Sequence, residues 1–369
     1  MRVKSLPIKE FKMKYDEVFS YSNIEQAYHD CCLSVGWKPS IQRYKNHRIT
    51  LLTSLYNKLK KRKFKSKGFY AFDIFERGKL RHIKSVNIEE RIVQRCLCDN
   101  CLVPLISPKL IYDNSACLTG KGYDFAISRI RRHITTFYRK NGLNGWILQF
   151  DIHHYFESIP HDKMIDLMAK IIDDKDILKL YCDLVNNFPG DVGLGLGGQI
   201  SQISAVYYLN SLDHFIKDRL GVKYYARYMD DGYVIAGNKD ELYFILEHIK
   251  IILKDLGLEL NNKTKITKLS KNFTFLKAKF LILSNGKIIM KPSRDNITKE
   301  RRKIKKLGNK FVEGTISSED INASIQSWKG HLLRFDSYNT IESMNKLYEE
   351  VLENAYTRIS SDAKRGKKV

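Results

Sequence analysis

The sequence predicts an α+β fold, with an antiparallel sheet backed by helices and then a helical, basic C-terminal region. Apolar residues recur at three- and four-residue steps across most of residues 23–106 and again from residue 292 onward, which is typical of helices. Residues 146–152 instead form a short apolar run, and residues 222–238 form two strand-like runs around a turn. Between residues 145 and 257 the predicted order is strand, helix, helix, hairpin, helix.

Turn signals predict two further hairpins. Residues 69–86 alternate around Arg77-Gly78, which indicates a hairpin that carries basic residues. Residues 273–291 contain Asn285-Gly286, the strongest local turn signal in the chain. A Gly-rich loop is expected over residues 190–198. Further helices are expected over residues 123–140, 160–172, 200–220 and 239–257.

The charge balance points to a polyanionic partner. The 369-residue chain has 64 Lys and Arg against 41 Asp and Glu, a formal net charge of +23. Such a balance favours nucleic acid first and an anionic membrane second. No apolar run approaches the ~18 residues of a membrane span, so a membrane partner is not expected. The hydrophobic content of 43% is enough for one large core or two to three smaller ones.

The N-terminus and the cysteines indicate a cytoplasmic protein. Charge is scattered through the first twenty residues, which lack the uninterrupted apolar core of a secretory signal. Seven cysteines, an odd number, suggest reduced thiols and not a disulfide framework. Cys96, Cys98 and Cys101 lack a nearby fourth ligand at zinc-finger spacing, so we expect buried structural cysteines there.

Three acidic residues form the candidate catalytic site. Asp151 ends an apolar strand, and Asp230 and Asp231 lie with Met229 at the turn of the 222–238 hairpin. Adjacent carboxylates repel one another unless a cation offsets their charge. An all-oxygen site selects magnesium or manganese. A solvated Asp-Asp turn is the commoner meaning of such a pair, but the apolar flanks make these acids project from a buried hairpin.

At these residues the chain resembles reverse transcriptases. Tyr228-Met229-Asp230-Asp231 matches their YxDD motif, and residues 149–160 resemble their first aspartate motif. Five further segments match in order: residues 78–94, 114–126, 258–266, 273–280 and 327–339. The resemblance, over roughly residues 70–345, implies a right-hand polymerase. Its expected parts are an N-terminal helical extension (1–70), fingers (71–144), a palm with parts of the fingers (145–290) and a helical thumb with a basic tail (291–369).

The resemblance also assigns roles to individual residues. It implies two Mg²⁺ ions, or Mn²⁺, held by Asp151, Asp230 and Asp231, with Ile152 as a further metal-binding position. Phe156 resembles the steric gate against a 2′-hydroxyl, with a core aromatic as the alternative. Lys79 and Arg81 resemble cations that hold the triphosphate, and Lys263 resembles a proton donor to pyrophosphate; solvated surface charges are the alternatives. The remaining predicted substrate-binding residues are Leu196, Gly197, Gln199, Ser201, Gln202, Tyr228 and Met229. Trp328 is expected to pack the thumb core.

The loop at residues 196–202 resembles one subgroup. Its aliphatic-Gly start and Ser-Gln end are similar to the reverse transcriptases of diversity-generating retroelements, where most of the family has Gln-Gly and Ser-Pro. Replacement of the usual glutamine by Leu196 removes a hydrogen bond that helps hold template and nucleotide in register. The resemblance therefore implies copying with errors at template adenines, as in mutagenic retrohoming.

The expected partners follow from the same resemblance. They are template RNA, the cDNA/RNA duplex, dNTPs and a small basic pentameric accessory protein. Two alternatives stay open. One is a group II intron-like or antiphage-defence stand-alone reverse transcriptase. The other is a catalytically inactive RNA-binding scaffold, although all three carboxylates are present.

Overall fold

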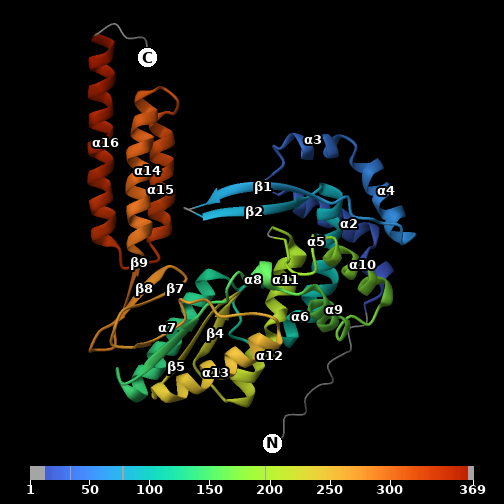
Figure 1. Ribbon diagram of the computed structural model, residues 1–369. Helices are drawn as coiled ribbons and strands as arrows, with labels where there is room; N and C mark the ends of the chain where they lie inside the picture. The colour runs from blue at the N-terminus through green and yellow to red at the C-terminus, as the bar shows by residue number, and fades with distance from the viewer. Residues whose placement is uncertain (1–12, 34, 77–78, 196, 365–369) are drawn as a thin grey trace, which may run out of the picture. The chain divides into compact units, whose positions relative to one another are not determined.

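The computed structural model describes residues 13–33, 35–76, 79–195 and 197–364 (Figure 1). For Lys79 and Arg81 the description covers the backbone. The chain divides into two compact units. Unit 1 comprises residues up to 132 together with 148–265, and unit 2 comprises 133–147 together with the residues from 266 onward. The predicted boundaries of fingers, palm and thumb stay a prediction, because these units are compact bodies and not functional subdomains.

Unit 1 is mostly helical. Its α-helices are α1 (Tyr15–Val18), α2 (Tyr21–Cys32), α3 (Pro39–Asn46), α4 (Arg48–Lys60), α5 (Ile88–Leu97), α6 (Val103–Ile106), α8 (Tyr155–Ser158), α9 (His161–Ala169), α10 (Lys175–Asn186), α11 (Gln199–Tyr208), α12 (Asn210–His214) and α13 (Lys239–Asp255). Shorter segments are the π-helical η1 (Cys98–Leu102) and η3 (Phe215–Arg219) and the 3₁₀ turn η2 (Ser107–Lys109). Cys96, Cys98 and Cys101 are buried in α5 and η1, as expected.

Side-chain caps fix where several of these helices begin. Asp174 accepts hydrogen bonds from the backbone N–H groups of Asp176 and Ile177 at 2.9 and 3.0 Å, and α10 starts there. Ser20, Asn87 and Asn238 cap α2, α5 and α13 in the same way. These short polar side chains satisfy N–H groups that have no partner inside the helix. Helix α10 was missing from the sequence prediction, although its capping residue and apolar spacing are present.

The strands confirm the predicted hairpins. Strands β1 (Phe69–Glu76) and β2 (Lys79–Val86) pair antiparallel, and their turn lies outside the described residues. Strands β4 (Tyr225–Tyr228) and β5 (Asp231–Ala236) also pair antiparallel, with Tyr228 opposite Asp231. They belong to a four-stranded sheet of order β4-β5-β3-β6, with β3 at Trp146–Phe150 and β6 at Lys265–Lys268. Helix α13 packs on β5.

Close packing of β3 on β5 depends on a glycine. A Cβ atom at Gly232 would lie 2.2 Å from the ring of Phe150, so no larger residue fits without displacing that ring. Phe150 is 2% exposed and stacks on Tyr225 at 6.4 Å between ring centroids. The residues that follow β3 and precede β5, Asp151 and Asp230, are thereby brought to the same end of the sheet.

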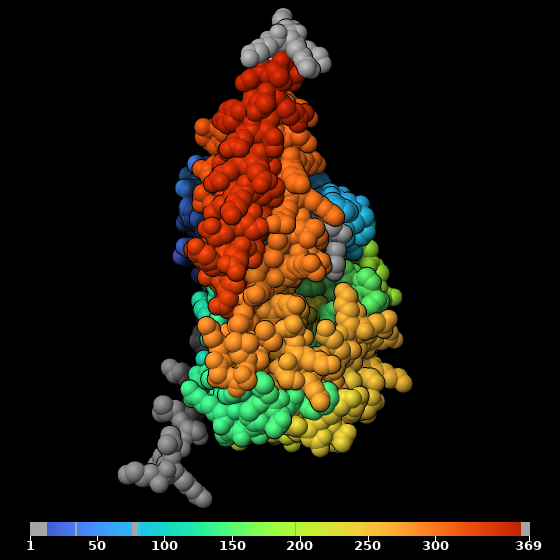
Figure 2. Space-filling view, turned by 90° about the vertical axis from the view of Figure 1, so that its left-hand side faces the viewer, coloured from blue at the N-terminus to red at the C-terminus, as the bar shows by residue number. Residues whose placement is uncertain are grey.

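Unit 2 combines a small sheet with three long helices. Strands β7 (Phe273–Phe275), β8 (Ala278–Ile282) and β9 (Ile288–Pro292) form an antiparallel sheet, where the sequence predicted a two-stranded hairpin. Helices α14 (Arg294–Val312), α15 (Ser318–Leu332) and α16 (Tyr338–Lys364) follow, and Figure 2 shows α16 in red alongside the orange helices. Ile304, Ile325 and Met344 form their core, against which Trp328 packs as predicted.

Helix α7 (Tyr123–Asn141) runs from unit 1 into unit 2. The α+β fold class predicted from the sequence is confirmed, because the chain combines helices with antiparallel strand pairs. None of the helices in the described part of the chain is long and apolar enough to cross a membrane.

Candidate active site

Asp151 follows the last residue of β3 and is held there by a neighbouring segment. The Asp151 carbonyl accepts a hydrogen bond from the Asn261 N–H at 2.7 Å, and the His153 N–H donates to the Glu259 carbonyl at 2.9 Å. Between these two bonds Ile152 forms an antiparallel bridge with Leu260. This pairing engages the backbone carbonyl of Asp151. The carbonyl of Ile152, which is the atom that Ile152 could offer to a metal, takes no part in it.

The hairpin turn that carries the other two acids is strained. Its central residues are Met229 and Asp230, and Asp231 is the first residue of β5. The sequence had placed Asp231 in the turn itself. Met229 has a φ of 54°, a left-handed conformation that costs free energy for a residue with a side chain. Such strain persists where surrounding contacts hold it.

The Asp230 carboxyl is buried near the other two acids. Burial raises the pKa of Asp230 to about 7, and the negative charges of Asp231 and Asp151 add to this rise. The nearby Asp151 carboxyl is the smallest of these contributions. Like charges this close cannot all ionise freely, so the metal-free site retains a proton near neutral pH.

The donor set suits a hard divalent cation. All the side-chain donors are carboxylate oxygens, the ligands that magnesium and manganese prefer. A cation would replace the proton on Asp230 and offset the repulsion among the carboxylates. Across the described ranges, no group of three or more His, Cys, Asp or Glu side chains is already arranged to hold a metal ion. The three acids therefore fit a divalent cation in the chemistry of their donor atoms and in their charge.

The Gly-rich loop is bound to the segment that follows Asp151. The Leu194 N–H donates to the Phe156 carbonyl at 2.7 Å, and the Gly193 N–H donates to the Ile159 carbonyl at 2.8 Å. Gly193 has a φ of 104°, and a Cβ there would lie 3.1 Å from the Glu157 carbonyl oxygen, so glycine is required. Phe156 and the loop are therefore fixed to one another.

A protein-family model described as "Reverse transcriptase (RNA-dependent DNA polymerase)" matches residues 60–280, which is more than half of the chain. The chain belongs to the reverse transcriptase family. It is 25% identical over 153 residues to the putative COX1/OXI3 intron 2 protein of Saccharomyces cerevisiae, a match covering 38% of this chain and 17% of that protein.

Solved telomerase structures are also similar to this reverse transcriptase chain. Apo telomerase from Candida tropicalis has a TM-score of 0.47 at 13% identity, with 80% of this chain and 59% of that chain covered. Telomerase from Candida albicans, in complex with the TWJ fragment of telomeric RNA, has a TM-score of 0.48 at 12% identity, with 88% and 60% covered. The chain spans less than two thirds of the length of each of these relatives. The predicted right-hand polymerase fold agrees with membership of the reverse transcriptase family.

The residues predicted to bind substrate in this reverse transcriptase lie in different environments. Phe156 is half-buried beside Tyr155, with ring centroids 5.7 Å apart. The Gln199 side chain donates to the Asp99 carboxylate at 2.8 Å. Ser201 is 1% exposed, and its hydroxyl has no hydrogen-bond partner. Gln202 is exposed and accepts a hydrogen bond from the Cys117 thiol at 3.8 Å.

The predicted cations are positioned by backbone pairing. On β2, Lys79 and Arg81 lie opposite Glu76 and Ile74 of β1. Lys263 is exposed and lies two residues beyond Asn261, the residue bonded to the Asp151 carbonyl.

Three further predicted substrate-binding residues remain. Gly197 is exposed, with a φ of 104°. Tyr228 is half-buried on β4. Leu196 lies outside the described residues.

Sequence reasoning missed a buried ion pair at the acidic turn, which is the hairpin turn of Met229 and Asp230 between β4 and β5. Arg227 and Asp213 are both 0% exposed, and Arg227 Nη2 lies 2.6 Å from Asp213 Oδ2. Arg227 Nη1 also donates to the Met229 carbonyl at 2.7 Å. The available signal was a charged residue in the middle of an otherwise apolar strand, because such a residue is informative when buried.

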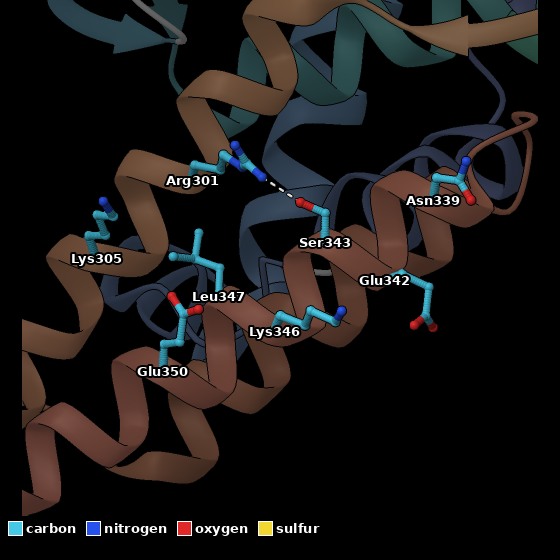
Figure 3. A pocket seen from close by; sticks show the side chains of 8 residues that line it. All are labelled: Arg301, Lys305, Asn339, Glu342, Ser343, Lys346, Leu347 and Glu350. Carbon is cyan, nitrogen blue, oxygen red and sulfur yellow. Dashed lines mark hydrogen bonds between the residues drawn. The ribbon is translucent and has the colours of Figure 1, made fainter.

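Helices α14 and α16 border a groove. A groove of about 620 Å³ lies between α14 and α16, and Figure 3 shows side chains from both helices around it. Arg301 donates a hydrogen bond to the Ser343 hydroxyl across this groove. Its lining carries three cations and two carboxylates, and consists of Arg301, Lys305, Asn339, Glu342, Ser343, Lys346, Leu347 and Glu350.

Proposed function

We propose that this reverse transcriptase copies a retroelement template RNA into error-prone cDNA, by nucleotidyl transfer at Asp151, Asp230 and Asp231. The observation that carries this proposal is the buried Asp230 carboxyl: burial raises its pKa to about 7, and the negative charges of Asp231 and Asp151 add to this rise. A repulsive acidic cluster at the end of a sheet costs stability, and a bound cation removes that cost. The cluster is therefore a site for divalent metal.

Asp151, Asp230 and Asp231 would hold two Mg²⁺ ions, with the Ile152 carbonyl as a further ligand. When bound, the ions supply activation of a 3′-hydroxyl and neutralisation of charge on the leaving pyrophosphate. The chain itself fixes the positions of the ligands through the Asn261–Asp151 bond and the strained Met229 turn. Lys79 and Arg81 bind the triphosphate, and Lys263 donates a proton to pyrophosphate. The basic thumb helices contact the phosphates of the RNA–cDNA duplex.

Magnesium should stabilise the protein more at pH 8 than at pH 6. Folding raises the pKa of Asp230 from 3.8 to about 7, so the metal-free protein loses stability as pH rises through this range. Mg²⁺ binds the ionised carboxylates and must displace one proton below pH 7. Its apparent affinity is therefore expected to fall about tenfold between pH 8 and pH 6. Thermal unfolding with and without Mg²⁺ at both pH values measures this.

The matched control for this experiment is Asp230→Asn, which removes the titrating carboxyl and should remove the pH dependence of the Mg²⁺ effect. Equal Mg²⁺-induced shifts in Tm at pH 6 and pH 8 in the wild-type protein would contradict the proposed linkage.

Phe156→Val should admit ribonucleotides. If Phe156 excludes the 2′-hydroxyl, loss of its ring raises the relative kcat/KM for a ribonucleotide by roughly 10- to 100-fold. Single-nucleotide extension with dCTP and CTP on one RNA template measures this ratio. Tyr155→Phe is the control, because it changes the neighbouring buried aromatic residue, whose hydroxyl donates to the Ala205 carbonyl at 2.5 Å. An unchanged ratio in Phe156→Val would assign this residue to the core instead.

The diversity-generating subtype rests on residues 196–202, of which the last four begin α11. Their aliphatic-Gly start and Ser-Gln end support loose discrimination of the nucleotide, and the partners that follow are a structured template RNA and a small basic pentameric accessory protein. Purified protein with this partner, RNA, dNTPs and Mg²⁺ is expected to yield cDNA whose errors concentrate at template adenines.

A variant of the same loop sharpens this test. Leu196→Gln introduces the glutamine usual in the family and should lower the error frequency at adenines by about tenfold, the value of one hydrogen bond of roughly 1.4 kcal/mol. Val192→Gln adds the same side chain at an exposed loop position and should leave the errors unchanged. Sequencing of the cDNA gives both frequencies.

A group II intron-like reverse transcriptase is the second candidate. The likeness to the yeast intron 2 protein favours it. Faithful cDNA from the wild-type protein, with no excess of errors at adenines, would support this candidate over the diversity-generating one.

A further inference from the structure

Arg227 is buried two residues before the central residue Met229 of the acidic turn, and its side chain turns back onto that turn. Its Nη1 donates to the Met229 carbonyl at 2.7 Å, and its Nη2 donates to the Val206 carbonyl at 3.0 Å. The side chain is 0% exposed, so water does not compete for these bonds. The guanidinium therefore links the turn to helix α11.

Asp213 holds the guanidinium in one orientation. Its two carboxylate oxygens accept from Arg227 Nε at 2.8 Å and from Nη2 at 2.6 Å. The Tyr225 hydroxyl donates to Asp213 at 2.6 Å, and Asn114 Nδ2 donates at 3.4 Å. With the Met229 contact, all three guanidinium nitrogens are engaged.

The backbone of Arg227 is fixed as well. Its N–H donates to the Asp113 carbonyl at 3.2 Å, and its carbonyl accepts from the Ser115 N–H at 3.0 Å. These bonds join Arg227 to residues 113–115 along the outer edge of β4, which is the first strand in the sheet order β4-β5-β3-β6. Both the main chain and the side chain of Arg227 are thus immobilised next to the turn.

A buried ion pair is weak evidence for stability, because apolar residues of similar size often serve as well or better. What apolar residues cannot do is bind the Met229 carbonyl. Met229 has a φ of 54°, and a strained residue keeps its conformation only where its surroundings determine it. The guanidinium is the side-chain group that the structure provides at this carbonyl. The planar guanidinium has several donors in fixed directions, so it can bind the Met229 carbonyl and Asp213 together. A lysine offers one compact charge instead.

We propose that Arg227 is the positioning residue of the active site: held by Asp213, it fixes the Met229 carbonyl and so the places of the Asp230 and Asp231 carboxylates relative to Asp151. Arg227 touches neither substrate nor reacting atoms, and it acts through the turn. The inference deepens the proposed function and rests on it for its activity readout.

The test compares two variants that each remove hydrogen bonds to Asp213, and only one of them removes the contact with the Met229 carbonyl. The double variant Arg227→Met/Asp213→Leu removes the ion pair and its contact with the turn, and leaves apolar side chains of similar size. Tyr225→Phe removes a hydrogen bond to the same Asp213 and leaves Arg227 on the Met229 carbonyl. Thermal unfolding establishes that each variant folds. Mn²⁺ titration followed by electron paramagnetic resonance, and steady-state primer extension on a defined RNA template, then report on the site.

The double variant is expected to bind Mn²⁺ with at least about tenfold lower affinity. Its kcat should fall about 100-fold, the effect of a displacement of about 1 Å in a catalytic group. Template–primer binding should be unchanged, and Tyr225→Phe should stay within about threefold of wild type in every measurement, the span of a net hydrogen bond of roughly 0.6 kcal/mol. If the double variant does not fold, Arg227→Lys, which keeps the buried charge, takes its place with the same expectation.

The outcomes separate the two claims. A folded double variant with wild-type Mn²⁺ affinity and kcat overturns the positioning role and leaves the proposed function standing. Equal losses in the double variant and Tyr225→Phe also overturn it, because the network would then be merely structural. If the wild-type protein makes no cDNA while Mn²⁺ affinity still falls in the double variant, the proposed function fails and the positioning role stands. A wild-type protein that binds no Mn²⁺ overturns the positioning role.

Discussion

Replacement of Asp230 by Asn is expected to abolish cDNA synthesis and to leave the fold intact. Loss of one metal-binding carboxylate removes several kcal/mol of charge stabilisation in the transition state, which corresponds to a rate loss of at least about 10³-fold. The fold should not suffer, because the pKa of about 7 shows that ionised Asp230 is unfavourable in the metal-free protein. A neutral amide of the same size relieves that repulsion. Primer extension and thermal unfolding measure the two effects.

The control is Asp166→Asn, which makes the same chemical change on the exposed face of α9 and should alter neither activity nor Tm. The combination of lost activity with retained or increased stability is typical of a catalytic residue. A scaffold would behave differently: its function in cells would survive Asp230→Asn. Retention of cDNA synthesis by this variant would contradict the assignment of the site.

Local signals were enough to predict the hairpin that carries the site. Strand-like runs flank Asp230, and a strand ends at Asp151, so the sequence placed these acids at turns and strand ends without any knowledge of their contacts. Their proximity was expected from the family resemblance, and the structure adds that the Asp230 carboxyl is buried where the charges of Asp231 and Asp151 further raise its pKa. Asn285-Gly286 likewise predicted the turn between β8 and β9.

Elements without a local pattern were not predictable. Strand β6 has the sequence Lys-Ile-Thr-Lys, four residues with no alternation of apolar and polar side chains, and it exists because it pairs in the sheet. The π-helical segments η1 and η3 depart from the 3.6-residue period on which helix prediction depends. The additional strand of the small sheet, β7, precedes a turn at Leu276 and Lys277, and the positive φ values of these two residues are not signalled by a Gly or Asn.

The Arg227–Asp213 pair was missed for a related reason. An arginine in a strand and an aspartate in a helix are usually solvated, and the apolar neighbours of Arg227 in its strand were the one local sign of burial. Their burial results from segments distant in sequence: Asp113, Asn114 and Ser115 cover the edge of β4. Sequence patterns report the period of an element, and they do not report which charged residue the tertiary fold encloses.

Replacement of Asp213 by Ala is expected to be among the most destabilising single changes in the described chain. It would leave the Arg227 guanidinium fully buried without its counter-charge. Burial alone lowers the pKa of Arg227, and the Asp213 carboxylate outweighs that effect and raises it. Removal of one partner of a buried pair typically costs about 3–5 kcal/mol. Urea denaturation measures the change in the free energy of unfolding, and near-ultraviolet circular dichroism verifies that the native state is retained before denaturant is added.

Asp218→Ala is the matched control, because Asp218 lies five residues further along the same helical stretch and pairs with His214 at 2.5 Å while 66% exposed. An exposed pair of this kind contributes about 0–1 kcal/mol, so this variant should unfold close to the wild-type midpoint. The double variant Arg227→Met/Asp213→Leu should regain most of the lost stability, since it leaves no unpaired charge. If Asp213→Ala lowered the free energy of unfolding no more than Asp218→Ala does, the guanidinium would have another way to satisfy its charge, and the turn would not depend on this pair. Recovery of stability in the double variant without recovery of cDNA synthesis would separate what the pair contributes to folding from what it contributes to the geometry of the acidic turn.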